Sequence, residues 1–151
     1  MATEQLEPIR RKLKTMWEYL DRLENKLPTE KEAYLRGEDM LHWGIERGCQ
    51  LSVECAIDTN NLLVTITGGS PPDTARDSFR AVFELGAIDQ AVRSVFQFKF
   101  VPFRNRIVHV YEDLDNSIVY ESAQSLLDHG RQYIQQMIAY LEQQDKDLVT
   151  L

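Results

Sequence analysis

The sequence has 151 residues, 43% apolar and 27% charged, which suits one domain with its own core, and we expect a single domain over residues 1–151. No apolar run is long enough to cross a bilayer, and the opening stretch MATEQLEPIRRKLK lacks the apolar core of a secretory signal. We therefore expect a cytoplasmic protein that does not bind a membrane. The net charge of −7 argues against broad electrostatic binding to DNA or RNA.

The N-terminal region has a regular apolar pattern. Its apolar residues recur at intervals of three and four, which predicts an amphipathic helix with one buried stripe. The stripe consists of Leu6, Ile9, Leu13, Met16, Leu20, Leu23 and Leu27. We expect Pro8 in the first turn of this helix, where its missing N–H costs nothing, and Pro28 at its end. Thr29 is then expected to cap the next helix, with Glu32 completing a capping box.

The same spacing predicts a long second helix over roughly residues 30–67. Its stripe consists of Tyr34, Leu41, Ile45, Gly48, Ser52, Cys55, Thr59, Leu62 and Ile66, with Glu38 as its one charged position. The stretch LLVTIT, residues 62–67, has the composition of a strand, but it continues the helical stripe without a breaker, so we predict helix. The stretch TGGSPPD, residues 67–73, ends the helix.

Shorter helices are predicted in the middle of the chain. One covers DTARDSFRAVFEL, with Gly86 as the residue just beyond its C-terminus, and another covers IDQAVRSVFQF. Pro102 is expected to open the next helix, and the stretch DLDNS to form a turn or cap. The last helix is expected over roughly residues 117–145, with a buried stripe at the same spacing that consists of Val119, Ala123, Leu126, Gly130, Tyr133, Met137 and Leu141. The predicted fold is all-α, an antiparallel up-and-down bundle of four main helices plus short ones.

The stretch FRNRIVHVY, residues 103–111, places polar residues among apolar ones in a way that a core helix would avoid. If Pro102 opens the helix, Arg104 lies in its first turn, where free N–H groups and the helix dipole favour a bound phosphate. His109 lies about 140° from Arg104 around an ideal helix and shares a face with Asn105. Such a pair suits metal-independent RNA cleavage, with histidine moving a proton and arginine stabilising the phosphate. Spacing alone leaves open a solvated arginine beside a structural histidine.

The motif RNRIVHVY resembles the Arg-x4-His-x-Tyr pattern of the HEPN superfamily, and specifically of HepT-like toxins. The order of segments resembles that family over nearly the whole chain: an amphipathic first helix, a long second helix, the GGSPPD break, DSFRAVFELGAI, the motif, an acidic turn and a long last helix. Many members have glycine where this chain has Pro102 and Val110.

The resemblance implies a homodimer in which two motif helices line one cleft, and a ribonuclease that acts in a toxin–antitoxin pair. It implies Arg104 and His109 as the catalytic pair, with Asn105 in support. The implied partner is a minimal nucleotidyltransferase antitoxin, which transfers AMP to the motif tyrosine, Tyr111. The alternative reading is a non-catalytic helical module that binds a nucleotidyltransferase, and a third is a plain dimeric bundle.

The remaining polar residues carry weaker signals. Residues 74–111 hold six Lys/Arg and three acids, a net +3 against −10 elsewhere, which suits a local anionic ligand. Within this region Arg106 either contacts the RNA backbone or solvates its helix. We expect no metal or other cofactor, because Asp115 or Asn116 is better explained as a helix cap than as a metal ligand. His42 and His129 are expected to be structural, and Cys49 and Cys55 to be reduced core residues.

Overall fold

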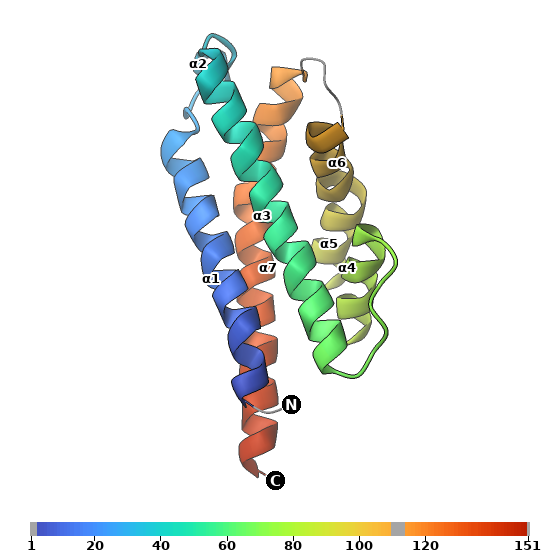
Figure 1. Ribbon diagram of the computed structural model, residues 1–151. Helices are drawn as coiled ribbons and strands as arrows, with labels where there is room; N and C mark the ends of the chain where they lie inside the picture. The colour runs from blue at the N-terminus through green and yellow to red at the C-terminus, as the bar shows by residue number, and fades with distance from the viewer. Residues whose placement is uncertain (1–2, 110–113, 151) are drawn as a thin grey trace.

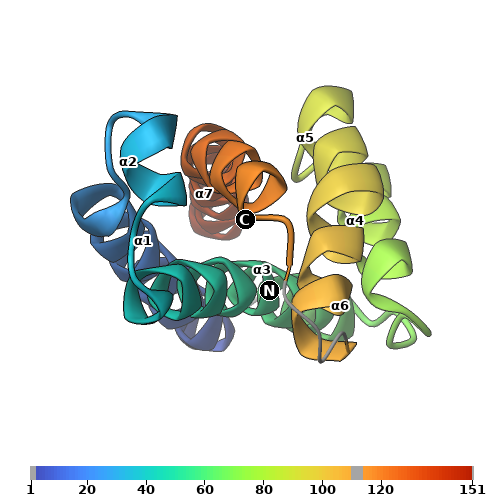
Figure 2. The same cartoon turned by 90° about the horizontal axis from the view of Figure 1, so that it is seen from above.

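The computed structural model describes residues 3–109 and 114–150, and this part of the chain is helical without any strand. Its elements are α1 (Thr3–Lys26), α2 (Lys31–Leu35), α3 (Asp39–Ile66), α4 (Ala75–Glu84), α5 (Gln90–Val95), η1 (Phe96–Phe100), α6 (Val101–His109) and α7 (Asn116–Thr150). The long helices run alternately up and down, and α7 lies between α1 and the segment formed by α5, η1 and α6 (Figures 1 and 2). The predicted all-α antiparallel bundle is confirmed. No described helix combines the length and the apolar character needed to span a membrane.

The first and last helices bury the stripes that their spacing predicts. All seven stripe residues of α1, from Leu6 to Leu27, are buried. In α7 the corresponding side chains, from Val119 to Leu141, are buried against them. One detail of α1 was wrong: Pro8 lies inside the helix and not in its first turn, because α1 already begins at Thr3. The missing N–H then removes one bond near a helix end.

The predicted second helix is two helices in the structure. The short α2 ends at Leu35, and α3 begins at Asp39. Gly37 lies in the break, where its N–H bonds the carbonyl of Tyr34 at 3.0 Å and closes α2 with a tight turn. The predicted Thr29 cap was also wrong, because Glu30 precedes α2 and makes no side-chain cap bond.

Helix α3 is the centre of the bundle, and it packs against α1, α4, α6 and α7. Its buried face differs from the predicted stripe: Cys49, Val53, Asn60 and Leu63 are buried, whereas the stripe residues Leu41, Gly48, Leu62 and Ile66 are only half-buried. The LLVTIT stretch is helical up to Ile66, as predicted. The cysteines are free and buried, and burial raises the pKa of the Cys49 thiol to about 12, so it stays protonated at neutral pH. This agrees with the prediction of reduced core residues.

Helices α5 and α6 form one rod with a π-helical turn, η1, between them. The N–H of Val101 bonds the carbonyl of Phe96, five residues back, so the helix does not end before Pro102. The widened turn accommodates a proline that can neither donate a hydrogen bond nor fit a regular α-helical turn. The prediction that Pro102 opens a helix was therefore wrong, and Pro102 lies in the interior of the rod.

Candidate functional site

Arg104 lies on α6 and reaches across to α3. Its Nε donates to Oε1 of Glu54 at 3.4 Å, and its Nη1 donates to Oδ1 of the neighbouring Asn105 at 2.9 Å. Glu54 is held in turn by Gln50, whose Nε2 donates to the same Oε1 at 3.0 Å. The Arg104 side chain remains 26% exposed, so a guanidinium oriented by two partners is still open to solvent.

The free helix end predicted at Arg104 is absent, because the rod continues through Pro102. Positive charge at this position therefore comes from the guanidinium itself and not from unpaired N–H groups of a helix start. The helix-start argument for anion binding at Arg104 was therefore wrong, and the functional role of Arg104 itself stays a prediction.

His109 is exposed at the end of α6 and is the last residue described before the gap. Around the helix it lies about 20° from Pro102 and 60° from Arg106, whereas it lies about 140° from Arg104. Among the described residues, no hydrogen bond joins Arg104 to His109. The structure therefore brings Asn105 and Glu54 to Arg104, and leaves His109 on another part of the same helix.

The other predicted site residues have mixed outcomes. Tyr111, Val110 and the acids Glu112 and Asp113 lie outside the described residues. Arg106 is exposed and borders a groove between α6 and α7. Asp115 accepts the N–H of Ser117 at 2.9 Å, which confirms its role as a helix cap. Over residues 4–109 and 114–145, no cluster of histidine, cysteine and acidic side chains is suited to hold a metal ion.

The two remaining histidines are structural, as predicted. His42 is buried, and its Nε2 lies 2.7 Å from the carbonyl oxygen of Tyr34. His129 lies half-buried on α7, with its Nδ1 3.0 Å from the carbonyl oxygen of Ser125. Both rings therefore contact the backbone of the bundle.

Sequence reasoning missed Glu54 and Gln50. Their spacing of four places them on one face of α3, and a carboxylate amid the small residues of a central helix was a usable signal. Nothing in the sequence, however, connects position 54 with position 104. That contact depends on how α6 packs against α3.

Comparisons with known proteins agree with this architecture. A protein-family model described as ribonuclease HepT-like matches residues 16–137. The tri-AMPylated HEPN toxin of Shewanella oneidensis, in complex with an MNT antitoxin, is similar in fold, with a TM-score of 0.77 and 24% identity over 87% of this chain and 96% of that chain. A toxin–antitoxin complex with AMP-PNP gives a TM-score of 0.77 and 24% identity over 87% of this chain and 97% of that chain.

A third similar structure has no stated activity. It is YutE of Bacillus subtilis, a cytosolic protein of unknown function, with a TM-score of 0.78 and 16% identity over 91% of both chains. No match was found among curated proteins.

Proposed function

The chain belongs to the HepT-like ribonuclease family, and from this premise we propose that it is the toxin of a toxin–antitoxin pair and a metal-independent endoribonuclease. The observation that carries the proposal is the state of Arg104. A guanidinium that is 26% exposed is oriented by Glu54 of α3 and by Asn105, and the short helix α6 that carries it also presents an exposed His109. A plain structural bundle does not need this arrangement.

In the proposed reaction His109 accepts the proton of a ribose 2′-hydroxyl, whose oxygen attacks the adjacent phosphorus. The bond from phosphorus to the 5′ oxygen of the next nucleotide breaks, and that oxygen takes a proton from the imidazolium. The products are a 2′,3′-cyclic phosphate end and a 5′-hydroxyl end. Arg104 stabilises the charge that develops on the phosphoryl oxygens.

The proposed partners are a second copy of the chain and a minimal nucleotidyltransferase antitoxin that transfers AMP to Tyr111. The toxin–antitoxin assemblies of similar fold, one of them with an AMPylated toxin, support this part of the proposal. The alternative is a non-catalytic module that binds the nucleotidyltransferase and cleaves nothing.

Cleavage of a mixed RNA pool by purified wild-type and variant chains tests the proposal. Arg104→Ala and His109→Ala should each lower the cleavage rate by about 10²- to 10⁴-fold, because each removes a group that acts in the transition state. EDTA should leave the wild-type rate unchanged, and the new ends should carry cyclic phosphate.

Two matched variants serve as controls. Arg22→Gln removes an exposed arginine on α1, and His129→Gln removes a histidine on α7 whose hydrogen bonds stay within α7 and whose ring lies 6.1 Å from that of Phe100. Both should cleave at the wild-type rate. If the wild type leaves RNA intact but binds a nucleotidyltransferase, the non-catalytic module is correct and the ribonuclease is not.

A further inference from the structure

A groove beside α6 carries exposed aromatic and basic side chains that the proposed reaction does not use. It has a volume of about 290 Å³ and lies between the η1–α6 segment and the start of α7. Phe98 and Ile118 line it and are 65% and 56% exposed. Lys99 and Arg106 also line it, and both are exposed. Aromatic rings with nearby cations are the combination by which proteins bind single-stranded nucleic acid.

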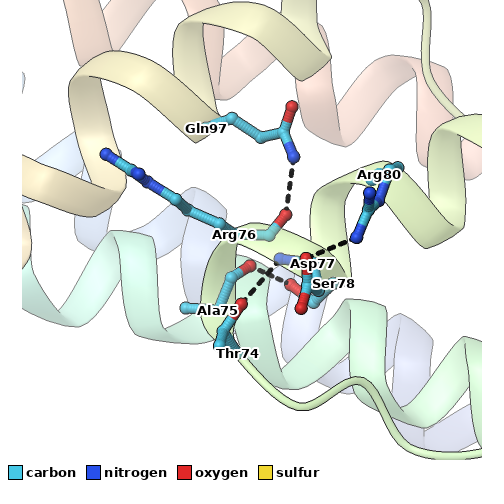
Figure 3. Close-up of polar contacts among 7 residues, drawn as sticks. All are labelled: Thr74, Ala75, Arg76, Asp77, Ser78, Arg80 and Gln97. Atoms are coloured by element: carbon cyan, nitrogen blue, oxygen red, sulfur yellow. Dashed lines mark hydrogen bonds and ion pairs between the residues drawn. The ribbon is translucent and has the colours of Figure 1, made fainter.

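Arg76 adds a third cation to this surface. Figure 3 shows its side chain extending away from Asp77 and Arg80, while its backbone carbonyl accepts a hydrogen bond from Gln97 Nε2 at 2.9 Å. The Cζ atom of Arg76 lies 5.9 Å from the centre of the Phe98 ring. The bond from Gln97 therefore fixes the start of α4 against η1 and keeps the guanidinium beside the ring.

Lys99 and Arg106 in the groove, and Arg76 beside it, differ from two other arginines of this region in having no carboxylate partner among the described residues. Arg80 pairs with Asp77, and Arg104 pairs with Glu54. In contrast, Arg76, Lys99 and Arg106 make no ion pair with any carboxylate in residues 3–109 and 114–145. Asp115 also lines the groove, but its carboxylate accepts the N–H of Ser117 at the start of α7. The local balance of charge therefore favours an anion on a protein whose net charge is −7.

The groove leads toward the proposed general base. Pro102, Arg106 and His109 follow one another at intervals of four and three residues, so they form one row along the rod. From Phe98 to His109 the helix rises about 16 Å. A strand that lies along this row would place its bases near Phe98 and its backbone near Arg106 as it approaches His109.

We propose that this groove, defined by Phe98, Lys99, Pro102, Arg106 and Ile118, is a subsite for single-stranded RNA. An unstacked base lies on the Phe98 ring, and the adjoining phosphates pair with Arg76, Lys99 and Arg106. The inference rests on the proposed ribonuclease function and names the form of its substrate. A second copy of the chain fits the groove less well, because a twofold axis through it would bring six cations together.

Binding of a short single-stranded oligoribonucleotide with 2′-O-methyl groups tests the proposal. This probe lacks the nucleophilic hydroxyl, so the intact wild-type chain can be used without cleavage. Fluorescence anisotropy should show that Phe98→Ala weakens binding by roughly 5- to 150-fold, the effect of losing one stacked base. Lys99→Gln and Arg106→Gln should each weaken binding and lower the slope of log affinity against log salt by about one. A duplex of the same sequence should bind more weakly and should not respond to Phe98→Ala.

Two matched controls lie outside the groove. Trp43→Ala removes another exposed aromatic ring, and Arg22→Gln removes another arginine placed over a ring, that of Tyr19. Both should bind the probe as wild type does. The subsite is wrong if Phe98→Ala binds the probe like wild type. It is also wrong if Phe98→Ala loses binding together with a change of oligomeric state, as measured by light scattering. In either case cleavage by wild type and its loss in His109→Ala would still support the ribonuclease, so the two proposals can fail separately.

Discussion

At the scale of single residues, the charge of Arg104 is partly compensated before any substrate arrives. Glu54 accepts from its Nε, and Asn105 accepts from its Nη1. A carboxylate beside a guanidinium that is proposed to bind phosphate has two opposing effects. It orients the guanidinium, and its negative charge repels the phosphate of the substrate. Because the pair is about a quarter to a third exposed, solvent screens both effects to about 0.2–1 kcal/mol.

Replacement of Glu54 by glutamine separates these two effects. Glu54→Gln removes the repulsion and loosens the guanidinium, so kcat should fall by up to about five-fold while KM does not rise. Steady-state cleavage kinetics on one RNA substrate give both values. Asp58→Asn is the matched control. Asp58 lies on α3, as Glu54 does, and its carboxylate pairs with Lys12 of α1 at 3.2 Å. A higher KM with an unchanged kcat would show that Glu54 does not orient Arg104.

Tyr111 is the proposed target of the antitoxin, and it lies outside the described residues. It follows His109 by two positions, so an added AMP would bring a phosphate and a bulky nucleoside close in sequence to the proposed general base. Co-expression with the nucleotidyltransferase should add AMP to the peptide that contains Tyr111, as measured by mass spectrometry. Tyr111→Phe should remain toxic in the presence of the partner, whereas Tyr19→Phe should be neutralised as wild type is. Neutralised Tyr111→Phe without an adduct would contradict the proposal.

The residues that sequence could identify are those within one motif. Arg104, Asn105 and His109 are adjacent enough for helical spacing and family resemblance to select them. Glu54 is fifty positions from Arg104, and only the packing of α6 on α3 brings the two together. The groove around Phe98 was missed for the same reason, because its walls come from η1, α6 and α7.

At the scale of the elements, helix periodicity predicted the long helices and failed where the backbone departs from a regular α-helix. Pro102 was assigned to a helix start because proline is most common there, but η1 lets the rod pass through it. The break between α2 and α3 was missed because the apolar stripe continues across Gly37 without a phase change. Gly86 was predicted correctly, since its φ of +87° is one that other residues avoid.

Two glycine substitutions should have opposite effects on stability. Gly86→Ala should destabilise the fold by about 1–2 kcal/mol, because Ala in the left-handed region brings its Cβ against the backbone. Gly44→Ala should stabilise it by about 0.5–1 kcal/mol, because Gly44 lies inside α3 and an added Cβ meets nothing within 4 Å beyond its chain neighbours and the backbone of its own helix. The midpoints of urea unfolding measure both. If Gly86→Ala raised the stability, the positive φ of Gly86 at the end of α4 would be wrong.

At the scale of the whole molecule, the bundle holds Arg104 against another helix but leaves His109 exposed to solvent. The reach of Arg104 to α3 ties it to the bundle core, while His109 is exposed at the end of α6. Two copies arranged around a twofold axis could bring the arginine of one chain to the histidine of its partner. Light scattering at micromolar concentration should therefore give about twice the chain mass of 17.6 kDa. A strict monomer that still cleaves RNA would exclude a shared cleft.

Mixing two inactive variants tests the shared cleft more directly. If each site combines Arg104 of one chain with His109 of its partner, a mixed dimer of Arg104→Ala and His109→Ala has one site with both groups intact and one with neither. Co-expression in equal amounts makes half of the dimers mixed, so about one quarter of the wild-type activity should return. A mixture of Arg104→Ala with the double variant Arg104→Ala/His109→Ala should stay inactive, because no pairing of those chains supplies an arginine. If the first mixture also stays inactive while mass measurements show mixed dimers, the two groups act within one chain, and α6 must then bring them together on its own.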